Sequence, residues 1–200
     1  MITQFNNGPE SCGFGWWWHS AEDTIDKIDA SVLRRDTQLY LAYLYHCLND
    51  TFFPLDLNAG VQEVFEYLDR YEKKAEKYIS LSPVKEAMTE VDRIVAELER
   101  IKAACKSQDE IKKHNEMTRM VGQLLVHLLY SGNCFFQHDP ALPQKPILLL
   151  SIAEQFTGQD NQDEDFMLTV ELRRRINQCV FWIEQCAKQV WPILHSLAVE

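Results

Sequence analysis

The residues with the clearest chemical potential lie in one segment, GFGWWWHSAEDTIDKID, which spans residues 13–29. Asp23 follows His19 after four residues, and a neutral imidazole with a carboxylate nearby to orient it is what a zinc site requires. His19 is therefore the leading candidate for a metal ligand, with a purely structural histidine as the alternative. Three consecutive tryptophans precede it: Trp16, Trp17 and Trp18. Their rings could line a substrate pocket, but burial at a domain junction is the simpler interpretation.

One histidine is not a complete site, because catalytic zinc usually takes three protein ligands. The segment has no H-E-x-x-H motif, and the chain shows no glycine-rich phosphate loop and no arguable Ser-His-Asp or Cys-His arrangement. The other histidines are scattered over predicted helices and loops, where packing or solvation explains them: His46, His114, His127, His138 and His195. By itself, the chain is therefore expected to contain no complete active site.

Composition and charge disfavour several kinds of partner. Thirty acidic residues against twenty Lys and Arg give a net charge of -10, which argues against nucleic acids and anionic membranes. The longest apolar runs, such as 147–150, are far shorter than the roughly 20 residues that cross a bilayer. None of the six cysteines forms a C-x-x-C pair, so we expect reduced core cysteines, with a disulfide framework as the alternative. Such cysteines favour a cytoplasmic compartment without establishing it.

The periodicity of apolar residues along the chain predicts an all-α protein, an antiparallel bundle of about five long helices plus one short one. Residues 1–15 show neither helical nor strand periodicity and predict an irregular N-terminal arm. Ser31 is a plausible N-cap for a helix that runs to about Asn49. The segment 39–45 is apolar or aromatic on every face, so this helix requires partners on more than one side.

Start and stop signals place the helices in the middle of the chain. Apolar residues recur at helical spacing over 61–79. Ser82 followed by Pro83 predicts an N-cap with proline at the first helical position. The segment 107–110 fits a capping box for a helix that ends at Tyr130.

The C-terminal third combines a proline-rich connection with a long helix. Three prolines within 134–146 predict an extended connection, and 147–156 predicts a short helix. The acidic segment 160–165 has the sign of charge that a helix N-terminus favours, so we expect it to open the last long helix.

The segment WWWHSAEDTIDKID, residues 16–29, resembles the end of the catalytic domain in the family of di-zinc aminopeptidases that also includes glutamate carboxypeptidase and the transferrin receptor. The pattern in that family is W-W-H-T-x-x-D-T-x-D-K-[IV]-D. Less specific similarities follow at Asp36-Thr37, at 54–56 and at 138–143, so the resemblance covers most of the chain.

The resemblance implies that His19 is the last ligand of two zinc ions, which polarise the scissile carbonyl and generate the attacking hydroxide. Asp23 would fix the loop and the imidazole ring. Ser20 stands where the family has threonine and keeps the hydroxyl. The other ligands and the general-base glutamate precede this motif in the family, so we expect a C-terminal fragment that is inactive by itself. Residues 1–50 would be a remnant of the catalytic domain, and 55–200 a C-terminal helical domain.

The resemblance also implies partners: the rest of the catalytic domain, and a peptide substrate in the intact enzyme. The first predicted helix packs on the central sheet in that family. Without a sheet, its broad apolar face would be uncovered, so we expect a homo-oligomer that forms through the region from Trp16 to Tyr45. The alternative is a non-enzymatic helical module for oligomerisation or partner binding, since the transferrin receptor shows that the fold can lose catalysis.

Overall fold

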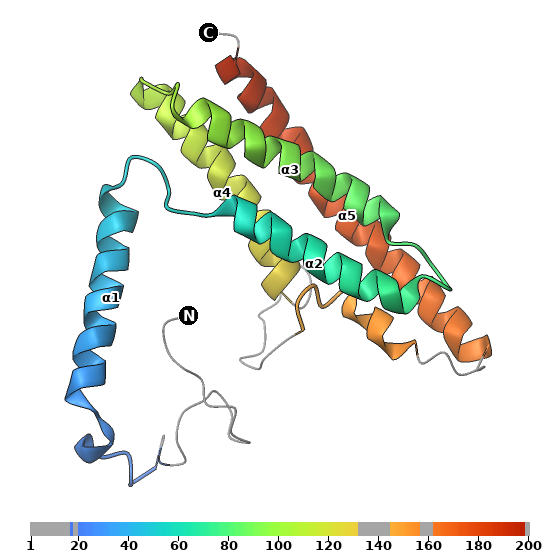
Figure 1. Cartoon of the computed structure of the whole chain (residues 1–200), viewed down its shortest axis with the longest axis horizontal. Helices are drawn as coiled ribbons and strands as arrows, with labels where there is room; N and C mark the ends of the chain where they lie inside the picture. Colours follow the sequence, from blue (N-terminus) through green and yellow to red (C-terminus); the bar gives the residue numbers. More distant parts are fainter. Residues whose placement is uncertain (1–16, 18–19, 132–144, 157–161, 199–200) are drawn as a thin grey trace. The chain divides into compact units, whose positions relative to one another are not determined.

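The computed structural model describes Trp17 and residues 20–131, 145–156 and 162–198. These residues form the helices α1 to α5 and the short 3₁₀ helices η2 and η3, with no strand among them (Figure 1). The prediction of an all-α helical bundle is confirmed. The chain divides into two compact units, one that ends at Pro54 and one that begins at Leu55. η2 and α1 belong to the first unit, and the remaining elements belong to the second.

In the first unit, η2 (Ile25–Lys27) leads into α1 (Ala30–Asn49). Asp29, and not the predicted Ser31, is the N-cap of α1. The Asp29 carboxylate accepts hydrogen bonds from the backbone N–H groups of Ser31, at 2.8 Å, and of Val32, at 3.3 Å. Asp and Ser both cap helices well. The backbone of Asp29 is extended, as is usual for an N-cap, so the helix begins directly after this residue.

None of the described side chains of α1 is buried. At 100° per residue, a narrow strip with the polar residues Gln38, His46 and Asn49 runs along one side of the helix, interrupted by Ala42. The remaining circumference is mostly apolar, and within 39–45 no residue is polar apart from the tyrosine hydroxyls. Its exposed large hydrophobic side chains are Val32, Leu33, Leu39, Tyr40, Leu41, Tyr43, Leu44, Tyr45 and Leu48.

The second unit begins with α2 (Leu57–Ala75), which starts and ends four residues earlier than the periodicity over 61–79 suggests. The Asp56 carboxylate caps the helix by accepting from the backbone N–H of Ala59 at 2.9 Å. After Ala75 the chain turns, and the N–H groups of Tyr78 and Ile79 both donate to the Ala75 carbonyl. These two side chains still pack against the core, which explains why the apolar pattern continues past the helix.

α3 (Ser82–Lys102) begins at the predicted serine, but Ser82 is its first helical residue and not its N-cap. The Ser80 hydroxyl accepts from the Ser82 N–H at 3.1 Å, so Ser80 provides a hydrogen-bond acceptor at the start of α3. α4 (Gln108–Tyr130) confirms the predicted capping box, since Ser107 and Glu110 each accept from the other's backbone N–H. Its end at Tyr130 is also confirmed.

The predicted short helix over 147–156 is instead a series of turns followed by η3 (Ser151–Gln155). Ile147 has a φ of 46°, which a β-branched residue rarely adopts and which interrupts a regular helix. The last helix, α5 (Gln162–Ala198), opens with the predicted acidic residues and contains Pro192 on its exposed side.

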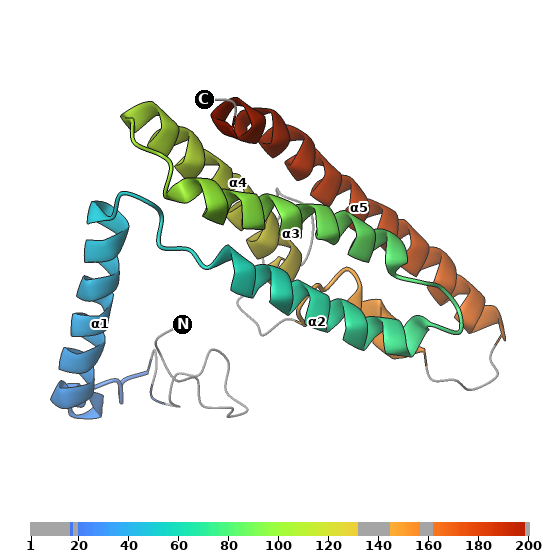
Figure 2. The ribbon, with the colours of Figure 1, turned by 45° about the horizontal axis from the view of Figure 1, so that its top comes forward.

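α2, α3, α4 and α5 form a four-helix bundle whose neighbours are not all antiparallel (Figures 1 and 2). α2 and α3 form an antiparallel hairpin, and α5 runs antiparallel to α4. However, α5 lies beside α3 in the same direction: the Trp191 indole N–H donates to Glu90 at 2.7 Å, and His195 lies further along beside Glu97. α2 and α4 are likewise parallel neighbours, because Leu57 approaches Gly122 and Gly60 approaches Leu125.

The core of the bundle runs along its length and draws on every helix of the second unit. η3 and the turn before it contribute to this core, because they pack against both α2 and α5. The side chains with no exposed surface include Val61, Leu68, Met88, Val91, Met117, Val121, Leu150, Leu172, Ile183 and Val190.

Candidate functional site

The loop before η2 is held together by short-range hydrogen bonds. The Trp17 carbonyl accepts from the backbone N–H of Ser20 at 3.0 Å and from its hydroxyl at 2.6 Å. The Ser20 carbonyl in turn accepts from the Asp23 N–H at 3.1 Å. The Ser20 hydroxyl therefore reinforces the backbone hydrogen bond between Ser20 and Trp17.

Carboxylates give the second half of this segment its local structure. Asp26 accepts from the Thr24 hydroxyl and from the Lys27 ammonium, and both contacts lower the pKa of its carboxyl, Lys27 most strongly. Hydrogen bonds from Ser31 lower the pKa of Asp29 in the same way. Both carboxylates are thus engaged in ordering the chain between the tryptophans and α1.

The predicted metal ligand, His19, lies outside the described residues, as do Trp16 and Trp18. Trp17 is described and half-buried, and Asp23 is described and exposed. Among the residues that the structure describes, no three His, Cys, Asp or Glu side chains gather closely enough to hold a metal ion. Alone, the described residues therefore do not fit a zinc site.

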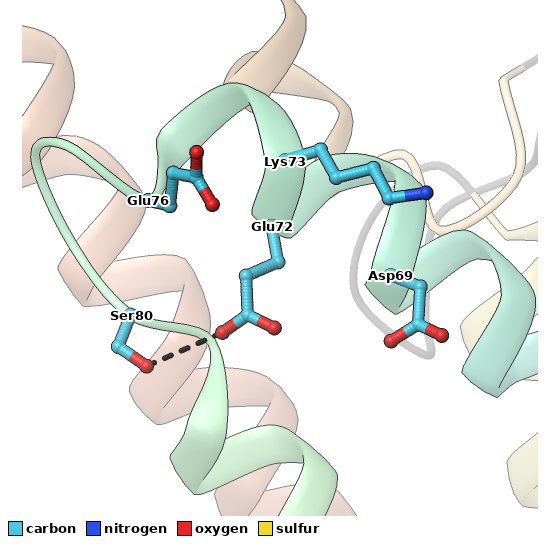
Figure 3. A pocket seen from close by; sticks show the side chains of 5 residues that line it. All are labelled: Asp69, Glu72, Lys73, Glu76 and Ser80. Atoms are coloured by element: carbon cyan, nitrogen blue, oxygen red, sulfur yellow. Dashed lines mark hydrogen bonds between the residues drawn. The ribbon is translucent and has the colours of Figure 1, made fainter.

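The pocket on the second unit lies where α2 turns into α3 (Figure 3). It is an open hollow of about 470 Å³ with predominantly charged walls, lined by Asp69, Glu72, Lys73, Glu76 and Ser80. The sequence pattern did not predict a site at these residues. The signal that could have found it is a carboxylate in the last turn of one helix and a lysine in the first turn of the next.

The contacts of Glu72 indicate that this pocket has a structural role. One carboxylate oxygen accepts from the Ser80 hydroxyl and from the Leu81 N–H, both at 3.3 Å, and the other pairs with Lys85. The Lys85 ammonium also lies 2.7 Å from Asp69. Lys85 lowers the pKa of both carboxyls, whereas Asp69 and Glu72 raise the pKa of Lys85. Glu72 and Lys85 thus clamp the α2–α3 turn from one wall of the pocket.

The remaining described histidines pack or form local pairs. His114 is buried, and its Nε2 donates to the Leu98 carbonyl at 3.1 Å; burial lowers the pKa of this histidine. His127 is also buried, with its ring edge-on to Trp182 at 4.3 Å between centroids. His46 pairs with Asp50 on α1. His114 and His127 are thus packing residues, and His46 is a surface residue, in line with the sequence analysis. His138 lies outside the described residues.

The cysteines that the structure describes are free thiols: Cys47, Cys105, Cys179 and Cys186. Cys179 and Cys186 are buried in the bundle, which matches the expectation of reduced core cysteines, and the other two are half-buried. In the described part of the chain, none of the helices combines the length and the apolar character needed to span a membrane.

The fold is thus that of an all-α bundle preceded by a separate unit that carries the histidine motif. Comparisons of this chain with protein-family models, with curated proteins and with solved structures give no match. Any function must therefore be argued from the motif and from the geometry described above.

Proposed function

We propose that this chain is the C-terminal portion of a zinc-dependent exopeptidase whose intact form hydrolyses peptides as an aminopeptidase does. The observation that carries the proposal is the segment of residues 17–29, WWHSAEDTIDKID. It matches the di-zinc peptidase pattern at each defined position except Ser20, where the hydroxyl is retained. A match of this length is far more specific than a lone histidine near a carboxylate.

His19 would supply the last zinc ligand, and Asp23 would orient it. Ser20 donates to the Trp17 carbonyl and Asp23 donates to the Ser20 carbonyl, and these hydrogen bonds among described residues support this role. Since the described residues form no metal site, the other ligands would come from the rest of the catalytic domain. The helices from Leu55 onward would cover the site or build a subunit interface.

The uncovered apolar surface of α1 is also in line with the proposal. A helix with a polar strip of only about one quarter of its circumference is suited to burial against a sheet rather than to the surface of a small bundle. In the intact enzyme, α1 would bury this surface against the catalytic domain.

The decisive experiment begins with the genomic sequence upstream of the codon for Met1. We expect an open frame that encodes the missing histidine and carboxylate ligands. The product of the longer frame, purified with zinc, should hydrolyse aminoacyl-nitroanilides, and His19→Ala should abolish this activity and reduce the zinc content. His46→Ala is the matched control, because His46 is an exposed histidine that pairs with Asp50 and should leave both readouts unchanged.

Two results would contradict the proposal. A stop codon directly upstream would leave the chain without its other ligands. Robust turnover by the 200-residue chain alone, lost on His19→Ala, would show that this chain is a complete enzyme and not a portion of one.

One observation favours a second function, that of a non-enzymatic module for oligomerisation or partner binding. The broad apolar face of α1 is exposed, and faces of this kind usually bind a partner. Under this alternative, the motif at 17–29 is a relic, and the chain self-associates through the region from Trp16 to Tyr45. The upstream sequence separates the two functions.

A further inference from the structure

His114 is a buried titratable side chain that the proposed function does not use. It belongs to α4 and is 4% exposed. Its Nε2 donates to the carbonyl of Leu98, in the last two turns of α3, at 3.1 Å. The imidazole ring thus joins α4 directly to α3, close to the turn between the two helices.

The packing around His114 favours a neutral ring. Leu98 and Ile101 of α3 are buried at this end of the bundle, as is Met117 on the next turn of α4. A charge among such side chains is costly, because it loses the water that would solvate it. The Leu98 carbonyl accepts from a neutral imidazole as well as from a protonated one, so the hydrogen bond forms without a charge on the ring.

The charges of α3 near His114 act in opposite directions. Burial has the largest effect on this histidine and lowers its pKa, whereas the hydrogen bond to Leu98 raises it. Lys102 lowers the pKa of His114 further, and Glu99 raises it. The balance of these influences leaves the pKa below its ordinary value.

On α4 itself, the polar groups close to His114 are neutral or already engaged. Glu110 and Thr118 lie one turn before and one turn after it, on the same face. The Glu110 carboxylate accepts from the N-cap of α4, and the Thr118 hydroxyl donates to the His114 carbonyl at 3.0 Å. The neutral side chain of Asn115 raises the pKa of His114, with a smaller effect than that of burial.

α5 ends at the same end of the bundle (Figures 1 and 2). The titratable residues in its last three turns are Lys188, which pairs with Glu184, and His195, which lies beside Glu97 of α3. Both are surface groups with partners of their own. α5 therefore carries no carboxylate in these turns that could pair with a protonated His114.

The turn between α3 and α4 can open without the rest of the bundle. α3 and α4 each pack more extensively against α5 than against each other. Ala103 and Ala104 in the turn are exposed, and Cys105 is half-buried. Segments with few buried contacts open at a lower free energy than the whole fold.

We propose that His114 is the acid-sensitive switch of this turn: the neutral ring holds the α3 and α4 ends together, and protonation releases them. The proposal goes beyond the proposed function, and it depends neither on zinc nor on His19.

The direction of the pH effect follows from the two states. In the open state, His114 is in water and binds its proton with the ordinary pKa of 6.5, whereas the closed state binds it only at lower pH. The closed state is therefore fully stabilised above pH 6.5. This stability is lost as the pH falls from 6.5 towards the lowered pKa of the closed state.

The test uses the Cys105 thiol as a reporter in the full chain with Ser in place of Cys12, Cys47 and Cys134. 4,4′-Dithiodipyridine reacts with thiols in acid as well as at neutral pH. Relative to a short peptide with one cysteine, the reaction of Cys105 should be about tenfold faster at pH 5 than at pH 7.5, which corresponds to a difference of about one pKa unit between the two states. Cys179 and Cys186, which are buried in α5, should remain unlabelled at both pH values.

Two variants assign the effect to one histidine. His114→Gln retains a donor for the Leu98 carbonyl but does not titrate, so the acceleration should disappear. His195→Gln is the matched control, because His195 is the exposed histidine at the same end of the bundle and its removal should leave the acceleration unchanged. Circular dichroism at both pH values checks that each variant is folded.

The other outcomes overturn the proposal. Equal relative rates at the two pH values, or an acceleration that persists in His114→Gln, would exclude His114 as the switch. Labelling of Cys179 and Cys186 together with Cys105 would show that the whole bundle opens. If His114→Gln does not fold, the NMR titration of the wild-type imidazoles decides, because a pKa of 6.5 or above for His114 would exclude the switch.

Discussion

Glu72 shows how much a single carboxylate contributes to the α2–α3 turn. Its hydrogen bonds to Ser80 and Leu81 tie the turn to α2, and its pairing with Lys85 ties α3 to the same point. The preceding residue of α2, Tyr71, has a comparable role: its hydroxyl donates to the Pro146 carbonyl at 2.5 Å and fixes the turn that precedes η3.

We expect Glu72→Gln to lower the free energy of unfolding by about 1 kcal/mol, because the neutral amide loses the charge-assisted contact with Lys85. The pKa of Glu72 is lowered in the folded chain, so its contribution is complete above pH 4.5 and is lost as the pH falls further. Urea unfolding at pH 7 and at pH 3 measures both effects. The difference between Glu72→Gln and the wild type should be large at pH 7 and small at pH 3, whereas Glu76→Gln, on the same pocket wall, should match the wild type at both.

Tyr71→Phe should lower the free energy of unfolding by about 1–2 kcal/mol, because the partly buried Pro146 carbonyl loses its donor. Burial raises the pKa of Tyr71 to about 12. The tyrosine therefore stabilises the fold fully below pH 10, and this contribution is lost as the pH rises through 12. Absorbance titration of tyrosinate should show one group with this high pKa that is missing in Tyr71→Phe. A variant with unchanged stability and an unchanged titration curve would contradict the role of the hydroxyl.

Among the elements, the helices themselves could be predicted from the sequence, but some of their first residues could not. Apolar periodicity and the capping box at Ser107 were sufficient for α4. The N-cap of α1 is Asp29 and not Ser31, and that of α3 is Leu81 and not Ser82, and the path of the backbone decides both. The local sequence pattern does not predict the backbone path before each helix.

Elements that depend on distant contacts were also missed. Residues 147–156 are apolar enough for a helix, but the backbone of Ile147 takes up an unusual conformation while its N–H donates to the Leu129 carbonyl. The clamp between Glu72 and Lys85 joins two helices. α5 lies parallel to α3 after the long connection between α4 and α5, and the length of this connection does not predict the direction in which α5 runs. The motif around His19 was identifiable only because its residues are consecutive.

A pair of serines tests the difference between an apparent and a real cap. Ser107→Ala should lower the free energy of unfolding by about 1 kcal/mol, because its hydroxyl accepts from the Glu110 N–H at 3.2 Å. Ser82→Ala should change it by less than about 0.5 kcal/mol, because α3 is not capped by that side chain. Urea unfolding of the two variants compares them directly. Equal effects, or a larger one for Ser82, would show that the assigned start of α3 is wrong.

At the scale of the whole molecule, the second unit holds most of the stabilising burial, and the first holds the segment around His19 and the exposed apolar side chains of α1.

The buried thiols report on the integrity of the bundle. Burial raises the pKa of Cys179 to about 12 and that of Cys186 to about 11, so both remain protonated and inaccessible at pH 8. In a variant with Ser at the other four cysteine positions, we expect no reaction with a thiol reagent in the native state and two equivalents in 8 M urea. Rapid native labelling of either thiol would mean that α5 leaves the bundle readily.

The parallel course of α3 and α5 has a consequence for how the chain folds as it is made. α5 packs along both α3 and α4, yet it follows them after the long connection that includes η3. At about 5–20 residues per second, a ribosome needs about 3 to 14 seconds to proceed from the end of α4 to the end of α5. During that interval the apolar faces of α3 and α4 await their neighbour, so the nascent chain is a candidate for chaperone binding until α5 has been synthesised.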